Sequence, residues 1–300
     1  MKKIYTKMAA GLGALACLMT MTAGLAACSS ENEEPKQDDG RKLRQLTIEN
    51  VALTRATLTD NVSTLGAAWK SGDAATYINL STLPSLNSGV LTAASDRTST
   101  SFTGSVTCTT GDRLALIYPA VSPAGVNGAF NINLSGQTGT LEDIAQCYHY
   151  VYGTGDVTSE TESTATGTIS SMKSLLAVCK FTFKDGSNNP IPVSNLKISY
   201  GGDLEAGYPQ SYSLTPNINA ESVNIPTNLT PSGSPLEVDL TENPASVVYV
   251  ALLPCGSSSE KVTFFFSVTT GSNVTYTGTA NAYLIAGRFY PVTITLTKQS

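Results

Sequence analysis

Cys147 and His149 could act together as a nucleophile and its base, because a histidine that takes the proton of a thiol makes the sulfur reactive. Such a pair also needs a third group that orients the imidazole, and the sequence shows none beside it. His149 is the only histidine of the chain, so a metal site with two histidines is excluded. We interpret His149 as a packed or rim histidine in a strand, on the same side as Cys147 and Val151.

Other catalytic patterns are missing from the sequence. Asp and Glu cluster mainly before residue 45 and in predicted loops, so no pair of carboxylates is spaced as glycoside cleavage requires. The glycine-rich stretches follow neither the phosphate-binding loop nor the dinucleotide pattern, and no CxxC motif indicates structural zinc. We therefore expect no enzymatic activity, no metal and no cofactor.

Cys28 is a candidate for covalent modification. It ends the sequence Leu-Ala-Ala-Cys at 25–28, behind three N-terminal lysines and an apolar run over 8–27, which is the layout of a cleavable export signal. The tetrapeptide resembles the lipobox of bacterial lipoproteins, and that resemblance implies removal of residues 1–27 and acylation of Cys28. Two or three acyl chains hold a protein firmly in a lipid layer. The alternative is an uncleaved N-terminal helix, although many Ala, Gly and Thr residues make the run weakly apolar.

Residues 28–45 are predicted to form a disordered acidic tether, because they are too polar to bury anything. The acidic pairs at 33–34 and 38–39 resemble signals that carry lipoproteins to the outer face of the outer membrane, and a solvated linker explains them equally well. Removal of residues 1–27 leaves 15 basic and 23 acidic side chains, a formal net charge of −8. This charge argues against binding to nucleic acid, which requires clustered Lys and Arg.

Beyond the tether, apolar residues alternate with polar ones, and Thr, Ser, Asn, Gly and Pro interrupt the pattern about every ten residues. This period of two is typical of antiparallel β-sandwiches, so little helix is expected after Gly40. The weakly apolar stretch 153–167 is predicted to be a mobile loop or linker. It would separate an N-terminal sandwich over 46–165 from a C-terminal sandwich over 166–300.

Aromatic side chains and thiols are the other candidates for function. Tyr148, Tyr150 and Tyr152 would line one face of a strand, and with Trp69 they could stack on sugar rings; ordinary packing between strands is the alternative. Four thiols remain in the folded part, and we expect each to be a small buried residue although three disulfide pairings stay open. They are Cys108, Cys147, Cys179 and Cys255.

Five sequence segments carry a resemblance to a known family: 54–58 (Thr-Arg-Ala-Thr-Leu), 69–73 (Trp-Lys-Ser-Gly-Asp), 114–119 (Leu-Ala-Leu-Ile-Tyr-Pro), 176–183 (Leu-Ala-Val-Cys-Lys-Phe-Thr-Phe) and 286–294 (Ala-Gly-Arg-Phe-Tyr-Pro-Val-Thr-Ile). In this order they resemble the fimbrillin-like family of type V pilins and related surface lipoproteins. The resemblance implies two tandem transthyretin-like β-sandwich domains, lipoprotein export and trimming after an N-terminal arginine, which Arg55 matches. Trimming in that family frees a groove that a strand of a neighbouring subunit fills.

Two features leave alternatives open. Arg41 and Arg44 compete with Arg55 as trimming sites. The sequence stops at Ser300, just past a predicted strand, which suits a tip or terminal subunit better than a shaft subunit. The leading hypothesis is a fimbrial subunit or fimbrium-associated adhesin with other subunits, outer-membrane lipid and a host or microbial surface ligand as partners. The rival hypothesis is a glycan-binding surface lipoprotein for nutrient uptake.

Overall fold

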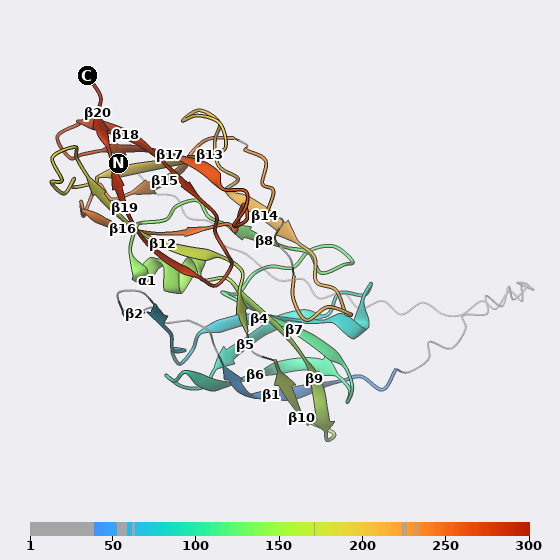
Figure 1. Cartoon of the computed structure of the whole chain (residues 1–300). Coiled ribbons are helices and arrows are strands. Elements are labelled where there is room, and N and C mark those ends of the chain that lie inside the picture. The colour runs from blue at the N-terminus through green and yellow to red at the C-terminus, as the bar shows by residue number, and fades with distance from the viewer. Residues whose placement is uncertain are drawn as a thin grey trace, which may run out of the picture. The chain divides into compact units, whose positions relative to one another are not determined.

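Strands make up most of the regular secondary structure in the computed structural model, which describes residues 39–52, 59–61, 64–170, 172–223, 225, 227–231 and 233–300 (Figure 1). Residues Gly40–Ser300 form one unit, and helix is limited to three single turns in the described ranges. The expected all-β class is confirmed. Cys28 and Arg55 lie outside the described residues.

The first half is built on one eight-stranded sheet that closes on itself. Its order is β10-β1-β6-β5-β4-β7-β9-β11, and a further pairing of β9 with β10 joins the two sides. Trp69 packs edge-on against Phe102 and Tyr118 inside it, with ring centroids 4.7 and 5.2 Å away. The strands are β1 (Lys42–Ala52), β4 (Ala74–Asn79), β5 (Ser88–Ala93), β6 (Ser99–Cys108), β7 (Arg113–Tyr118), β9 (Val151–Glu160), β10 (Thr164–Ile169) and β11 (Lys173–Ser174).

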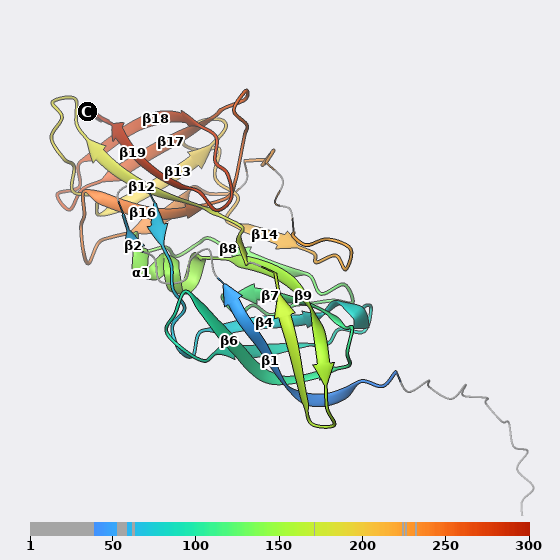
Figure 2. The same cartoon turned by 60° about the horizontal axis from the view of Figure 1, so that its bottom comes forward.

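The second half is a sandwich of two sheets (Figure 2). The smaller sheet has the order β16-β12-β19, and the larger has the order β15-β13-β17-β18-β20. The rings of Phe181, Phe183 and Phe266 pack between the sheets, with distances of 5.2 to 6.0 Å between their centroids. The strands are β12 (Ala177–Lys184), β13 (Asn195–Tyr200), β15 (Leu236–Asp239), β16 (Val247–Leu252), β17 (Val262–Thr269), β18 (Thr275–Ala282), β19 (Phe289–Thr295) and β20 (Thr297–Lys298).

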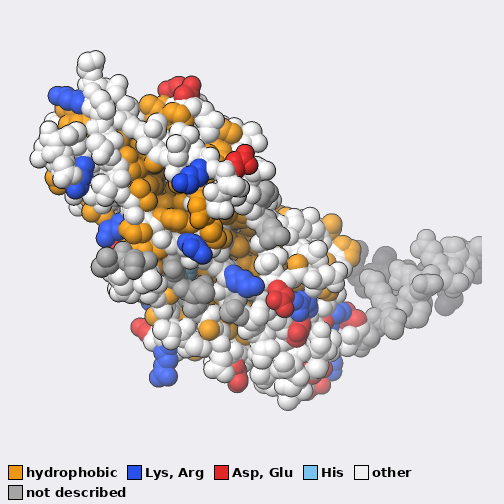
Figure 3. Space-filling model, in the orientation of Figure 1, with side chains coloured by type: hydrophobic (Ala, Val, Ile, Leu, Met, Phe, Trp, Pro, Cys, Tyr) orange, Lys and Arg blue, Asp and Glu red, His pale blue; other side chains and the backbone are white. Residues whose placement is uncertain are grey.

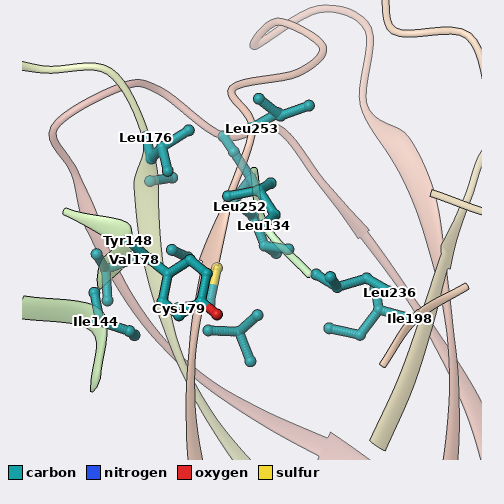
Figure 4. Packing of buried hydrophobic residues seen from close by; sticks show 14 of the residues in the cluster. Leu134, Ile144, Tyr148, Leu176, Val178, Cys179, Ile198, Leu236, Leu252 and Leu253 are labelled. Carbon is teal, nitrogen blue, oxygen red and sulfur yellow. The ribbon is translucent and has the colours of Figure 1, made fainter. Parts of the chain in front are cut away.

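A segment of the first half completes the core of the second. It contains β8 (Phe130–Asn133), which pairs with β14 (Ser211–Leu214), and the turns α1 (Leu141–Asp143) and Ile144–Tyr148. Figure 4 shows Leu134, Ile144 and Tyr148 beside residues of β12, β13, β15 and β16. Burial of Leu134 and Ile144 in that shared core removes apolar surface of both halves from water.

Gln137 fixes this segment to the edge of β16. Its side-chain amide is buried, donates to Ala251 O at 3.0 Å and accepts from Ala251 N at 2.7 Å, as a neighbouring strand would. Gly139 O then accepts from Tyr249 N at 2.9 Å. Residues 137–139 therefore cover an edge that would otherwise expose unpaired backbone groups.

The stretch 153–167 is not a linker, which corrects the sequence-based expectation. It forms most of the β9–β10 hairpin, so the expected boundary between residues 165 and 166 falls inside β10. A Cβ atom at Gly155 would lie 1.7 Å from Thr168 O, so glycine is needed for the two strands to approach. The weakly apolar sequence predicts a loop, but its Thr and Gly residues form a two-stranded hairpin that is partly exposed.

Candidate functional site

The first strand lies inside the sheet rather than at its edge. Residues 45–49 of β1 run parallel to β10, and residues 42–52 run antiparallel to β6 (Figure 1). β1 begins at Lys42, so residues 42–45, which we expected in the tether, belong to the fold. Removing β1 would therefore leave a groove with unpaired backbone groups on both sides.

Apolar side chains of β1 fill the interior of this groove. Leu46, Ile48 and Val51 are fully buried. The step of three residues from Ile48 to Val51 comes from a bulge at Asn50, which has a φ of 53°, a conformation that asparagine tolerates better than most residues. Trp69 Nε1 donates to Val51 O at 3.0 Å and closes the end of the strand.

At the N-terminal end of β1, three basic side chains form ion pairs with acidic residues elsewhere in the first half. The Arg41 guanidinium forms two bonds to the Asp112 carboxylate, with a shortest distance of 2.6 Å, and Asp112 is only 2% exposed. Arg44 is 4% exposed and bonds Glu160 Oε1 at 3.0 Å. Lys42 bonds Glu162 at 2.8 Å on the surface and lowers the pKa of that carboxyl group. The sequence-based interpretation missed these pairs, because their members lie 71 to 120 residues apart.

The two competing trimming residues are engaged in these contacts. A protease that cuts after arginine needs an extended, accessible chain, whereas Arg44 is buried, pairs with Val106 in the ladder to β6 and directly precedes the ladder to β10. Arg41 is held at Asp112. The geometry therefore argues against trimming at either position in the folded protein.

The chain after residue 58 is attached to the second half. Asp60 lies in β2 (Thr59–Asp60), which pairs with β3 (Leu65–Gly66). Its carboxylate bonds Lys180 Nζ at 2.5 Å and Tyr249 OH at 2.7 Å, on the outer face of the β12–β16 pair. Asp60 thus ties the first chain segment beyond Arg55 to the second half.

The predicted aromatic platform does not exist. Trp69, Tyr148, Tyr150 and Tyr152 are all buried, and only Tyr152 belongs to a strand. Tyr148 OH donates to Ser135 O at 2.8 Å, and Tyr150 OH accepts from Asn133 N at 3.2 Å. These rings pack the interior and cannot stack on a sugar in solution. The prediction that residues 148–152 form one strand is wrong, because Tyr148 ends a helical turn and β9 begins only at Val151.

The Cys147 and His149 pair does not face one side of a strand either. Cys147 is exposed on the Ile144–Tyr148 turn, whereas His149 is buried, which agrees with a packed histidine. Cys108, Cys179 and Cys255 are buried as expected, and all four thiols are unpaired. Exposure of Cys147 contradicts the expectation for that residue.

An open cleft of about 1250 Å³ lies between residues 135–141 and the edges of β15 and β16. Polar side chains that line it bond to neighbouring protein groups: Glu237 to Asn195 at 2.7 Å, and Gln210 to Pro235 O at 3.0 Å. None of the predicted aromatic residues lines it. On the face shown in Figure 3, basic and acidic side chains are mixed over the first half, and hydrophobic ones gather over the second.

Comparison with solved structures gives the fold a context. The structure resembles that of a candidate cell adhesion protein from Bacteroides uniformis, with 13% identity, coverage of 89% of this chain and 98% of the other, and a TM-score of 0.51. A candidate cell adhesion protein from Bacteroides fragilis matches with 13% identity, 86% and 97% coverage and a TM-score of 0.49. A tip fimbrial protein of Porphyromonas gingivalis with a C-terminal truncation matches with 9% identity, 84% and 94% coverage and a TM-score of 0.41.

No family model and no curated protein matches the sequence. The likeness to the B. uniformis structure spans most of both chains, and at this identity it is a likeness of fold. It agrees with the resemblance to surface proteins that the sequence motifs carry. Within the described part of the chain, helices are too short or too polar to span a lipid bilayer.

Proposed function

We propose that the protein is a structural or adhesive fimbrial subunit, or an adhesin associated with a fimbrium, and that it assembles by strand exchange after trimming behind Arg55. The position of β1 between β6 and β10 carries this proposal. β1 ends at Ala52, three residues before Arg55, so a cut there separates it covalently from everything that follows. The strand is then held only by noncovalent contacts.

A strand from a neighbouring subunit would replace β1 in the groove. It would restore both ladders of backbone hydrogen bonds and rebury the interior. Burial of side chains such as Leu46, Ile48 and Val51 contributes about 1.5 to 3 kcal/mol each, so an empty groove is unfavourable and filling it with a donor strand is favourable. The joint needs no enzymatic activity and no cofactor.

Acylated Cys28 and the segment after it would anchor the untrimmed protein to outer-membrane lipid, facing outward. The lipobox-like sequence and the acidic pairs support this location. Other fimbrial subunits are the proposed partners, together with a ligand on a host or microbial surface. The net charge of the exported chain supports neither DNA nor RNA as a partner.

The proposal is tested with Arg55→Ala on intact cells. The native protein should give a surface form that lacks residues 1–55 by mass and ladders on unheated gels, and the variant should give neither. Arg97→Ala is the matched control, because Arg97 is exposed and a cut behind it would not release β1 alone. Identical masses for all three proteins, without ladders, would refute trimming and strand exchange.

The glycan-binding alternative has lost its main support. It depended on exposed rings at Trp69, Tyr148, Tyr150 and Tyr152, and all four are buried. The open cleft beside β15 includes hydroxyl, amide and carboxylate groups, but Glu237 and Gln210 in it are hydrogen-bonded to neighbouring groups of the protein. We therefore do not propose nutrient uptake as the function.

A further inference from the structure

We infer that the groove of β1 selects a donor strand with an arginine at the position of Arg44, followed by apolar residues two, four and seven positions later. This inference rests on the proposed strand exchange and specifies the partner's chemistry. The apolar positions are those of Leu46, Ile48 and Val51. The arginine position is defined by a set of acceptors, which we call the Arg44 cradle: Glu160 Oε1 and the carbonyl oxygens of Cys108 and Thr161.

The cradle contains only acceptors, and it encloses an arginine side chain that is 4% exposed, although Glu160 itself is 25% exposed. Arg44 Nε donates to Thr161 O at 2.8 Å, Nη2 donates to Glu160, and Nη1 donates to Cys108 O. The three acceptors receive bonds from three different nitrogens of one guanidinium, whereas an ammonium is a compact point charge. A strand without an arginine here would deprive the buried Cys108 carbonyl and the partly buried Thr161 carbonyl of this donor and leave the Glu160 carboxylate without its cation.

The acidic groups are held in place by residues outside β1. Thr110 N donates to Glu160 Oε2 at 2.5 Å. Asp112 is the partner of Arg41, which lies three residues before Arg44. Its carboxylate accepts hydrogen bonds from Asn79 Nδ2 at 2.8 Å and from Thr109 N at 3.1 Å. Both carboxylates therefore stay aimed at the groove when β1 is absent. The cradle is preorganised for an incoming strand.

The cradle also sets the direction and register of the donor. Backbone hydrogen bonds alone tolerate slippage along a groove, because every residue offers the same groups. The groove requires a cation at the position of Arg44 and a bulge at the position of Asn50, and these two requirements fix the direction and the register of the donor strand. Charge complementarity of this kind excludes wrong partners more than it adds affinity to the right one.

The test uses mature protein trimmed with trypsin, after inhibition of the protease, and a fluorescent peptide with the sequence of residues 41–52. Unlabelled peptides compete for the groove, and their affinities are compared by anisotropy. Arg44→Gln in the peptide should weaken binding by about 10-fold or more, and Arg44→Lys should recover only part of the loss. Lys42→Gln is the control, because it removes one exposed charge and should change affinity by less than about 3-fold.

The outcomes separate this inference from the proposal beneath it. Equal affinities of the native and Arg44→Gln peptides would overturn the arginine requirement and leave strand exchange intact. Failure of every peptide to bind, the native one included, would overturn strand exchange itself. With Glu160→Gln in the protein, the advantage of the native peptide over the Arg44→Gln peptide should shrink by about 3-fold or more, and an unchanged ratio would count against the cradle.

Discussion

At the scale of single residues, buried thiol and phenol groups of this chain contribute to packing. Burial raises the pKa of the Cys255 thiol to about 11 and the pKa of the Cys179 thiol further, so both stay protonated and unreactive at neutral pH. Burial also raises the pKa of Tyr148 and Tyr152 to about 12. Groups with such shifts in a closed interior are structural, because neither water nor a substrate reaches them.

Thiol labelling should distinguish Cys147 from the other three thiols. Cys147 is exposed, whereas Cys108, Cys179 and Cys255 are buried. Partial burial, and Asp143 after it, raise the pKa of Cys147, so its labelling rate should increase as the pH rises from 7 to 9. Iodoacetamide followed by peptide mass spectrometry should find the label at Cys147 in native protein and at all four thiols in urea. Labelling of Cys179 without denaturant would contradict the burial.

At the scale of elements, β1 depends on a few buried side chains. Ile48→Ala should lower the free energy of unfolding by about 2 to 5 kcal/mol, because it leaves a cavity between β6 and β10. Leu43→Ala removes a similar side chain from the same strand, but Leu43 is 69% exposed and should cost less than about 0.5 kcal/mol. Urea unfolding of both variants measures the difference. Equal losses would show that the face assignment of β1 is wrong.

The β9–β10 hairpin depends on Gly155. Gly155→Ala should destabilise the protein by about 1 to 3 kcal/mol or more, because the new methyl group meets the backbone of Thr168. Gly271→Ala provides the control, since a Cβ atom there meets nothing within 4 Å. Thermal melts should separate the two variants clearly. A normal melting temperature for Gly155→Ala would mean that β9 and β10 lie further apart than described.

Strands with one dry and one wet face could be predicted from the sequence, and others could not. Phe181 and Phe183 in β12 alternate with polar residues, Phe264 and Phe266 in β17 flank the partly buried Phe265, and all four of the named alternating residues are buried. The β9–β10 ribbon gives no such signal, because much of it is exposed and glycine replaces side chains where the strands approach. The Arg44 cradle was invisible, since its acceptors are backbone carbonyls and one distant glutamate.

At the scale of the whole molecule, one buried core contains residues of both halves, and the interior of the closed sheet is a second, separate core. Buried residues from β8 and its following turns belong to the same cluster as β12 and β16. We therefore expect the two halves to unfold together rather than as independent units. Pairing of β8 with β14 joins segments about 80 residues apart, and such a partner cannot be read from local pattern.

Gln137 should be needed for this shared core. Gln137→Ala removes the bonds to both backbone groups of Ala251 and leaves them buried, so the free energy of unfolding should fall by about 1 to 3 kcal/mol. Gln146→Ala is the control, because Gln146 is exposed and bonds only to Glu142. A single unfolding transition at lower urea for Gln137→Ala is expected. Two separate transitions in the native protein would contradict a shared core.

The double pairing of β1 has a mechanical consequence. A pull on the Lys42 end acts along the strand and loads the ladders to β6 and β10 together, since the hydrogen bonds stand across the direction of force. Bonds loaded in shear must yield together, whereas bonds peeled from an edge break one at a time. A donor strand in the same place would inherit this geometry. A string of subunits joined in this way would carry tension along its length and resist the drag of a flowing liquid.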